Sequence, residues 1–409
     1  MTGAPAHTAA STRSRWRRLV PLAASTVASQ ATIVALAPIL AAVARDFGTG
    51  VGTVGLARAV LAFAAAAGSV PVAAYGNRLG PARLIVLGGV IGLCACAAIA
   101  AAPSLTVFLA AHIVAGGAVA CLLSAGFAGA SAFFHGREVG WALGFVVGAQ
   151  SLAWIVGNPI IGVLTDTVSW RAAYLVPATA ALVAVVGGLR APRTCGSGDS
   201  GLAALVSIWC DVGARRWTVA ELVAFGAWTA ELTYAGAFYI ETYGVREASV
   251  GFLLACGSAV YLAVAATSGR HLVGRRARLW AIAGALGMAA AFVPLLNVTP
   301  AVAFTLAAFC VTAFFAALRS TASSALALVQ LPAQEATMMA ARTASAQLGY
   351  VFGAAAGGAV IGAAGFGTLG WLLAAGMCAS ALLMARVPAP TSDRPGATAR
   401  APSPPRAGS

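Results

Sequence analysis

Glu231 is the acidic side chain best placed to do chemistry, because it lies near the middle of a long apolar run at about residues 218–240. Trp228, Tyr234 and Phe238 lie at i−3, i+3 and i+7, so they share its face of a helix. An acid flanked by aromatic rings suits a cavity that takes up a proton and an amphipathic, even cationic, substrate. Glu231 is therefore predicted to couple protons, with the three aromatic residues as substrate contacts. The alternative is a permanently protonated acid that only hydrogen-bonds to a neighbouring helix.

The other ten acidic residues lie at the ends of apolar runs or in polar segments. Glu221 is one of them, because it stands near the start of the run that contains Glu231. Glu231 is thus expected to be the only carboxylate deep in an apolar segment.

His112 lies inside a different apolar run, at about residues 105–131. An ionisable residue is costly to bury in such a segment, which makes it a candidate for function. Histidine titrates near neutral pH, so His112 is predicted as a second proton-coupling residue. A neutral His112 that hydrogen-bonds between helices remains equally open.

Polar residues in other apolar runs could contact a substrate. Ser29 and Gln30 are predicted to line a cavity, although a serine hydroxyl can also bond back to its own helix. Arg58, Arg319 and Arg342 lie within about two helical turns of the ends of their runs, where a guanidinium can reach the membrane surface. Arg58 is the strongest candidate for substrate contact, since its run follows a loop that carries an acid.

The composition requires these residues to be positioned by membrane-spanning helices. Of the 409 residues, 60% are hydrophobic and 9% are charged, and the mean hydropathy is +0.89. A soluble domain has about 25% charged residues, so a soluble fold is excluded. The apolar runs are too long for barrel strands and do not alternate, which predicts helices. Twelve runs are present, at about 19–44, 52–75, 84–102, 105–131, 139–164, 172–189, 218–240, 249–267, 279–296, 301–322, 338–362 and 368–385.

The distribution of arginine predicts the orientation of these helices. All 25 basic residues are arginine. With the N-terminus inside, 19 of them fall on the cytoplasmic side and three on the other, as the positive-inside rule requires. The arginines form no basic face interleaved with aromatic residues, so nucleic acid is not an expected partner. A multi-pass protein of the inner (plasma) membrane with both termini in the cytoplasm is predicted.

A polar central stretch divides the twelve runs into two groups of six. The predicted units are a cytoplasmic N-terminal tail (1–18), a first six-helix half (19–189), a cytoplasmic linker (190–217), a second six-helix half (218–386) and a disordered cytoplasmic tail (387–409). The two halves have similar sequence patterns, since Gly157 and Gly162 in the fifth run correspond to Gly353 and Gly358 in the eleventh. Repeats of this kind are typical of transporters, with the substrate site at the repeat interface.

The loop after the second run carries the most specific motif. Its residues Asn77, Arg78 and Gly80 resemble the motif Gly-x-x-x-Asp-Arg-x-Gly-Arg-Arg of the major facilitator superfamily, with asparagine in place of the acid. In the fifth run, Pro159 and Gly162 match part of the pattern associated with exporters of that superfamily. The chain is similar to the twelve-helix drug:proton antiporters over about residues 18–386. This resemblance implies an all-α membrane fold of two pseudo-symmetric halves and gives these five residues a role in conformational cycling.

Motifs for other chemistry are missing from the sequence. It contains no Walker loop, no Gly-x-Ser-x-Gly elbow and no His-Glu-x-x-His helix, and its Cys and His residues are not spaced as metal ligands. No enzyme activity, nucleotide, metal or other cofactor is expected. The prediction is a secondary active transporter that exports a small organic molecule, a drug or a metabolite, in exchange for protons across the lipid bilayer. The alternatives are uptake or exchange of a sugar or organic acid by the same fold, and a polytopic membrane enzyme or sensor.

Overall fold

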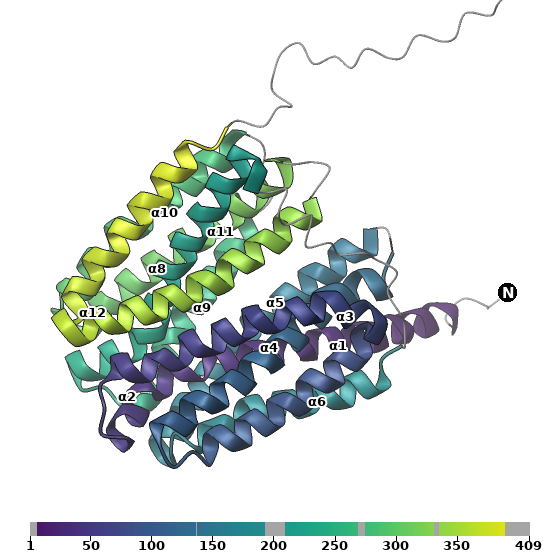
Figure 1. Ribbon diagram of the computed structural model, residues 1–409, viewed down its shortest axis with the longest axis horizontal. Helices are drawn as coiled ribbons and strands as arrows, with labels where there is room; N and C mark the ends of the chain where they lie inside the picture. Colours follow the sequence, from purple (N-terminus) through teal and green to yellow (C-terminus); the bar gives the residue numbers. More distant parts are fainter. Residues whose placement is uncertain (1–5, 136, 193–208, 269–274, 331–334, 389–409) are drawn as a thin grey trace, which may run out of the picture.

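The computed structural model describes residues 6–135, 137–192, 209–268, 275–330 and 335–388, and every regular element in these ranges is a helix (Figure 1). A short 3₁₀ helix (Ala172–Tyr174) precedes α6. The α-helices are α1 (Ala6–Val34), α2 (Leu36–Asp46), α3 (Val51–Ala100), α4 (Leu105–Phe133), α5 (Arg137–Thr167), α6 (Leu175–Arg190), α8 (Val212–Tyr243), α9 (Glu247–Ser268), α10 (Arg275–Asn297), α11 (Val302–Gln330) and α12 (Glu335–Ala385).

Polar side chains set where two of these helices begin. The Asp211 carboxylate accepts a hydrogen bond from the Ala214 backbone N–H at 2.6 Å and caps α8. The Ser104 hydroxyl accepts one from the Val107 N–H at 3.4 Å and caps α4. The cap at Asp211 starts α8 before the apolar run that was expected at about 218–240.

Two of the helices are too long for one membrane crossing, and glycine divides each of them. α3 has 50 residues and would be about 75 Å long if it were straight. It breaks at Gly80 (φ 76°, ψ 159°), and α12 breaks in the same way at Gly365 (φ 77°, ψ 178°). Residues with a Cβ essentially do not adopt this conformation, so glycine is required at both turns. Each of the two helices therefore makes two spans.

The described part of the chain contains twelve spans, as predicted. Ten segments are long and apolar enough to cross a membrane, and one of these, Ala341–Ala385, is divided in two by Gly365. The twelfth is α8, which is long enough at 32 residues but carries five charged side chains. The protein is therefore an all-α polytopic membrane protein.

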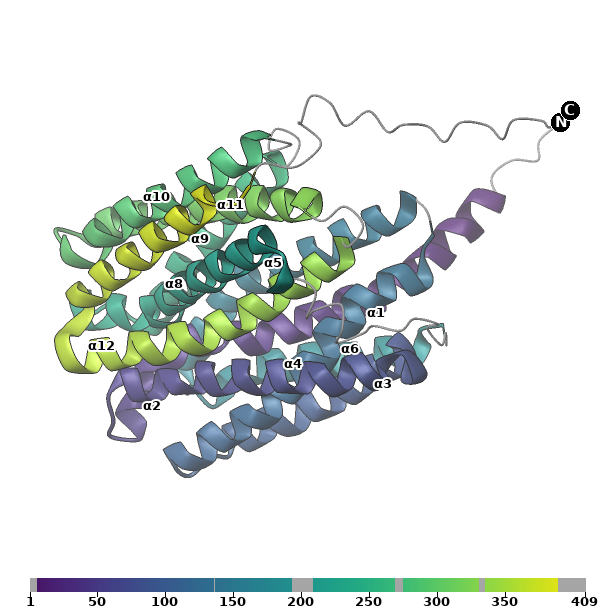
Figure 2. The same cartoon turned by 45° about the horizontal axis from the view of Figure 1, so that its top comes forward.

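The helices form two bundles that correspond to the predicted halves. α1 to α6 pack on one another in the first half, and α8 to α12 do so in the second (Figures 1 and 2). The halves meet where α3 lies against α12 and α5 lies against α9. We call the end of the molecule with the start of α1 and the last turn of α12 the terminal end, and the opposite end, with Asp46 and Glu247, the far end.

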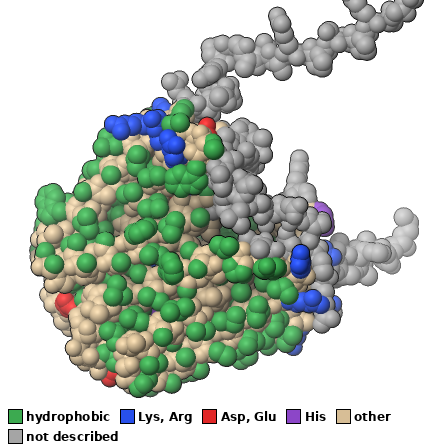
Figure 3. Space-filling view, viewed as in Figure 1, with side chains coloured by type: hydrophobic (Ala, Val, Ile, Leu, Met, Phe, Trp, Pro, Cys, Tyr) green, Lys and Arg blue, Asp and Glu red, His purple; other side chains and the backbone are tan. Residues whose placement is uncertain are grey.

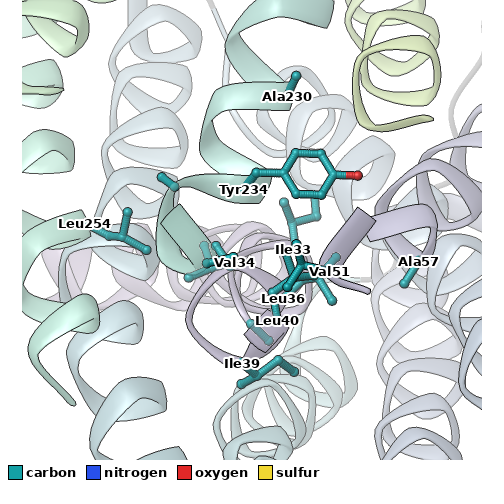
Figure 4. Packing of buried hydrophobic residues seen from close by; sticks show 14 of the residues in the cluster. Ile33, Val34, Leu36, Ile39, Leu40, Val51, Ala57, Ala230, Tyr234 and Leu254 are labelled. Atoms are coloured by element: carbon teal, nitrogen blue, oxygen red, sulfur yellow. The ribbon is translucent and has the colours of Figure 1, made fainter. Parts of the chain in front are cut away.

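Among the described residues, the hydrophobic core joins the halves toward the far end. The largest buried cluster contains residues from both halves, among them Ile33 and Val34 at the break between α1 and α2, and Tyr234 of α8 (Figure 4). Two smaller clusters lie toward the terminal end, and each belongs to one half: Leu22 and Phe133 lie in one, and Trp217 and Leu326 in the other. The halves are therefore packed together at the far end and separate toward the terminal end.

The surface matches a lipid environment. Large apolar side chains such as Phe63, Trp371 and Leu382 are more than 60% exposed, and hydrophobic side chains cover the flank seen in Figure 3. In the same view arginine side chains gather toward the terminal end. Apolar atoms on this scale would be unfavourable in water but are favourable against lipid tails.

Candidate functional site

Glu231 lies on α8 in the wall of a small buried cavity. The side chain is 3% exposed, and neither carboxyl oxygen has a hydrogen-bond partner among the described residues. The space left for the centre of a water molecule is about 10 Å³, enough for a single water. The lining residues all belong to the second half: Glu231, Tyr234, Ala235, Phe238, Tyr239, Leu295, Leu296, Thr305, Phe309, Phe366 and Leu369. In this conformation the cavity can hold a water molecule that brings a proton to Glu231, but it is too small for an organic substrate.

The structure separates the aromatic residues that were predicted to surround Glu231. Phe238 lines the cavity and packs edge-on against Phe366 at 5.3 Å. Tyr234 also lines it, but its hydroxyl lies at the interface between the halves, where it donates to Ala354 O of α12 at 2.7 Å and lies 3.4 Å from Gly52 O of α3 in the other half. Trp228 stacks on Tyr261 of α9 at 6.2 Å, away from the cavity.

The polar residues of α1 contact their own half. The Ser29 hydroxyl donates to Thr26 O at 2.8 Å, which is the back-bonding that was the alternative to lining a cavity. Gln30 accepts a hydrogen bond from the Trp154 indole N–H of α5 at 3.0 Å. Neither residue is part of the lining of the Glu231 cavity, and their substrate contact stays a prediction.

Arg58 lies at the interface between the halves and is 5% exposed. Its Nη1 donates to Ile33 O at 2.8 Å, and its guanidinium carbon lies 5.2 Å from the ring centre of Tyr350 on α12. Nε has no partner among the described residues. Asp46, at the end of α2 before this helix, accepts from Arg171 at 2.8 Å, and substrate contact by Arg58 stays a prediction.

The structure corrects the expectation that Glu231 is the only deep carboxylate. Glu221 of α8 is completely buried. It forms an ion pair with Arg319 of α11, accepts from the Ser323 hydroxyl at 2.9 Å, and lies 3.5 Å from Arg342 of α12. Glu221 and these two arginines were assigned to the ends of apolar runs, and the apolar pattern along one helix cannot show that they face one another.

A signal for this cluster was present in the sequence. A buried charge needs a partner, so two arginines in apolar runs imply at least one acid near them. Here that acid is Glu221, so Arg319 and Arg342 turn inward toward it. Their positions near the ends of apolar runs had instead placed their guanidinium groups within reach of the membrane surface. Arg342 Nη2 also donates to the Ser320 hydroxyl at 2.7 Å.

Backbone contacts between small residues close the far end. A Cβ at Gly251 of α9 would lie 2.9 Å from Pro159 Cα of α5, and a Cβ at Gly162 would lie 3.2 Å from Gly251 Cα. Gly52 and Gly358 meet in the same way between α3 and α12. Pro159 and Gly162, the residues of the exporter-like motif, thus lie where the halves touch.

Comparison with known proteins assigns the fold. The Major Facilitator Superfamily profile matches residues 22–337. The chain belongs to the Major Facilitator Superfamily. A search of curated protein sequences finds no match. Among solved structures, the chain resembles a bacterial homologue of the human lysosomal transporter Spinster in its inward-facing, unoccupied conformation, with TM-score 0.69 and 13% identity over 91% of this chain and 95% of that one. The inward-facing, occupied conformation of such a homologue gives 0.69 and 14% over 89% and 94%.

This membership defines the general activity. As a Major Facilitator Superfamily protein, the chain is a secondary transporter of small molecules that works by alternating access, and it is not an enzyme. The packed far end and the separate terminal end are the two sides of such a cycle, in which a site between the halves is exposed to one side at a time.

The superfamily loop motif is described only in part. Gly80 makes the turn between the two spans of α3, and the Arg78 guanidinium carbon lies 6.0 Å from the Tyr75 ring centre. The side chain of Asn77 lies outside the described part of the chain.

Ion pairs between the halves surround the closed far end of the transporter. Arg246 binds Asp166 through two bonds, Nη2 to Oδ2 at 2.5 Å and Nε to Oδ1 at 3.1 Å, and Arg45 pairs with Glu247. Hydrogen bonding to Asp166, followed by its negative charge, raises the pKa of Arg246 above its ordinary value. The pairs link opposite halves, so they can form only when the far end is closed.

Removing both ion pairs is expected to shift the transporter toward a conformation with the far end open. In Asp166→Asn with Glu247→Gln, the population of that conformation should rise about two- to fivefold, because exposed ion pairs stabilise only weakly. Double electron–electron resonance measures the change as the distance distribution between spin labels at Val168 and Thr242, which lie on opposite halves. Glu138→Gln is the control, since it breaks the pair with Arg15 within one half. An unchanged distance distribution in the double variant would contradict the expectation.

His112 lies on α4 of the first half, beside the 3₁₀ helix that precedes α6, and is 1% exposed. Its Nδ1 is 2.7 Å from Phe108 O, which can only accept, so Nδ1 carries the proton. In the neutral ring Nε2 then accepts from the Tyr174 hydroxyl at 3.2 Å. Both ring nitrogens have partners in the neutral form, which favours the structural role over proton coupling.

His112→Gln is therefore expected to keep the pH dependence of transport. The variant should lose about 0.5–1.5 kcal/mol of stability, because glutamine cannot make both hydrogen bonds in the same geometry. Initial transport rates against pH in proteoliposomes test this expectation. A flattened pH profile would instead assign proton coupling to His112.

Proposed function

We propose that the protein exports a small organic molecule across the inner (plasma) membrane in exchange for protons, with Glu231 as the proton-binding residue. The observation that carries this proposal is a fully buried carboxyl with no countercharge and no hydrogen-bond partner among the described residues. An ionised carboxylate is far more costly to bury than a neutral acid. The conformation with the far end closed is therefore compatible with a protonated Glu231.

The link between protonation of Glu231 and closure of the far end supplies a mechanism for coupling transport to protons. After substrate leaves at an open far end, a proton binds Glu231 and removes its charge, so that Phe238 and Phe366 can pack around it. The far end then closes and the terminal end opens, where the proton leaves and substrate binds. The proton gradient thus drives the return of the empty substrate site. Proton and substrate need not occupy the same cavity, and the size of the Glu231 cavity favours separate sites.

The direction of transport rests on two observations. Pro159 and Gly162 of the exporter-like motif lie at the contact of α5 with α9 between the halves. The arginine-rich terminal end is the cytoplasmic side under the positive-inside rule. Substrate would then enter from the cytoplasm, in the conformation that the solved Spinster homologue structures name inward-facing.

Transport by the purified protein tests the proposal. In proteoliposomes with an imposed pH gradient, a substrate found by screening toxic compounds for protection of expressing cells should accumulate against its own gradient. Its movement should dissipate the pH difference. Equilibration without accumulation would instead support facilitated exchange, the alternative activity of the same fold.

The orientation gives a separate prediction. In a variant without native cysteines, single cysteines at Ser197 and Ser403, which both lie outside the described residues, should be inaccessible to membrane-impermeant thiol reagents in intact cells. They should react after the membrane is opened, because the arginine distribution places the linker and the C-terminal tail in the cytoplasm. Labelling of either cysteine in intact cells would reverse the orientation and, with it, the proposed direction.

A further inference from the structure

Positive charge is in excess between the helices of the second half and α3. Arg319 and Arg342 share a single carboxylate, Glu221. Arg58 faces only a backbone carbonyl and the Tyr350 ring among its described contacts. Arginine stays protonated at all physiological pH, so this region is cationic whether or not Glu231 is ionised.

Aromatic rings connect the three arginines. Arg319 and Arg342 lie 5.4 and 5.1 Å from the ring centre of Phe225. Phe225 packs edge-on against Tyr350, with their ring centres 5.9 Å apart. Tyr350 in turn contacts the Arg58 guanidinium. Close approach of α8 and α12 brings these rings together, since a Cβ at Gly349 would lie 2.9 Å from Gly226 N.

The arrangement leaves guanidinium N–H groups available to a ligand. Arg342 and Tyr350 are eight residues apart on α12, so they lie on one face at a separation of about 12 Å. The Arg342 side chain is 21% exposed, on the side where the halves are separate. Nε of Arg58 has no hydrogen-bond partner among the described residues, whereas Nε of Arg342 lies 3.5 Å from the Glu221 carboxylate. A buried, unpaired donor on a permanent cation such as Arg58 is costly and calls for an anionic partner.

We propose that the substrate is an organic anion whose carboxylate or phosphate group binds Arg58 beside Tyr350, with the excess positive charge at Arg342 attracting it toward that site. Planar guanidinium groups bind either oxyanion through paired hydrogen bonds. Arg342 attracts the anion at the separated terminal end, and Arg58 binds it at the interface, where closing of the halves can enclose it. The ring of Tyr350 packs against the apolar body of the substrate. The inference rests on the proposed transport function and adds the chemical class of the substrate.

Equilibrium binding to the full-length protein in nanodiscs tests the proposal without requiring transport. Four probes of similar size are compared by calorimetry: 3-phenylpropionate, phenyl phosphate, phenethylammonium and phenethyl alcohol. The two anions are expected to bind, and the amine and the alcohol are not. The relative affinities of the first two probes distinguish a carboxylate from a phosphate substrate.

Variants connect the binding to the arginines. Arg58→Met should weaken anion binding about 10- to 100-fold, the effect of losing hydrogen bonds to a charged group. It should still fold, because it leaves no acid unpaired. Arg58→Lys keeps the charge but loses the paired geometry, so intermediate affinity is expected. Arg171→Met is the control and should bind the anions as the wild type does, because the exposed ion pair of Arg171 with Asp46 lies within the first half.

Equal binding of the amine, failure of both anions to bind up to their solubility limits, or full anion affinity in Arg58→Met would overturn the inference. None of these results would bear on proton coupling, which is measured by accumulation under a pH gradient. Conversely, anion binding that depends on Arg58 would stand even if transport proved independent of protons.

Discussion

Replacement of Glu231 by glutamine is expected to abolish proton-driven accumulation while leaving the protein folded and able to bind substrate. Glutamine has nearly the volume of a protonated glutamate, so the small cavity lined by Phe238 and Phe366 can close around it in the absence of a proton. The far end then closes irrespective of pH, and the cycle loses its link to the gradient. A difference of one pH unit can support about tenfold accumulation for each proton exchanged, and the variant should show none.

The measurement is substrate accumulation in proteoliposomes under an imposed pH gradient, together with counterflow, which needs no proton movement. Glu231→Gln should lose the first and keep the second, whereas Glu231→Asp should retain part of both. Glu241→Gln is the matched control, because Glu241 is an exposed acid on the same helix. Concentrative transport by Glu231→Gln that still dissipates the pH gradient would remove Glu231 from the mechanism.

Loss of the Glu221 carboxylate is expected to have the largest effect on stability. Glu221→Gln leaves Arg319 without its ion pair and takes the nearby negative charge from Arg342, all in a buried site. Breaking a buried pair from one side costs about 3–5 kcal/mol. The midpoint of unfolding in denaturant should therefore fall sharply in detergent or nanodiscs.

Two comparisons separate this effect from a general loss of charge. Glu138→Gln breaks an ion pair with Arg15 whose side chains are 46% and 47% exposed, and it should cost no more than about 1 kcal/mol. Combining Glu221→Met with Arg319→Met removes both buried charges of the close pair, so part of the stability should return. A Glu221→Gln protein as stable as the Glu138→Gln control would show that the buried pair contributes little.

The apolar pattern was sufficient to predict the architecture. Each membrane crossing needs about 20 apolar residues, which is a local property that can be read along the chain. The twelve spans and their division into halves follow from it, as does the depth of Glu231 within α8. The turn at Gly80 was also predictable, because its motif requires a conformation that other residues avoid.

The interactions of the buried polar residues depended on tertiary packing. Helical spacing placed Tyr234 and Phe238 on the face of Glu231, but only the rotation of α8 in its bundle decided that Phe238 lines the cavity while the Tyr234 hydroxyl reaches the other half. Glu221 and Arg319 are 98 residues apart, and no periodicity along the chain relates them. Which end of the transporter is closed was equally undetermined by the sequence.

The order of apolar and polar residues along the chain specifies a membrane protein of twelve helices with a few costly polar residues inside them. Burial in lipid forces each such residue to find a partner, a proton or a ligand, but it does not specify which. That choice was made by the packing of helices from distant parts of the chain. Contacts between small residues such as Gly251 and Pro159 fix how the halves meet, and the pairing of Glu221 with Arg319 leaves Glu231 and Arg58 without countercharges in the part of the chain that the structure describes.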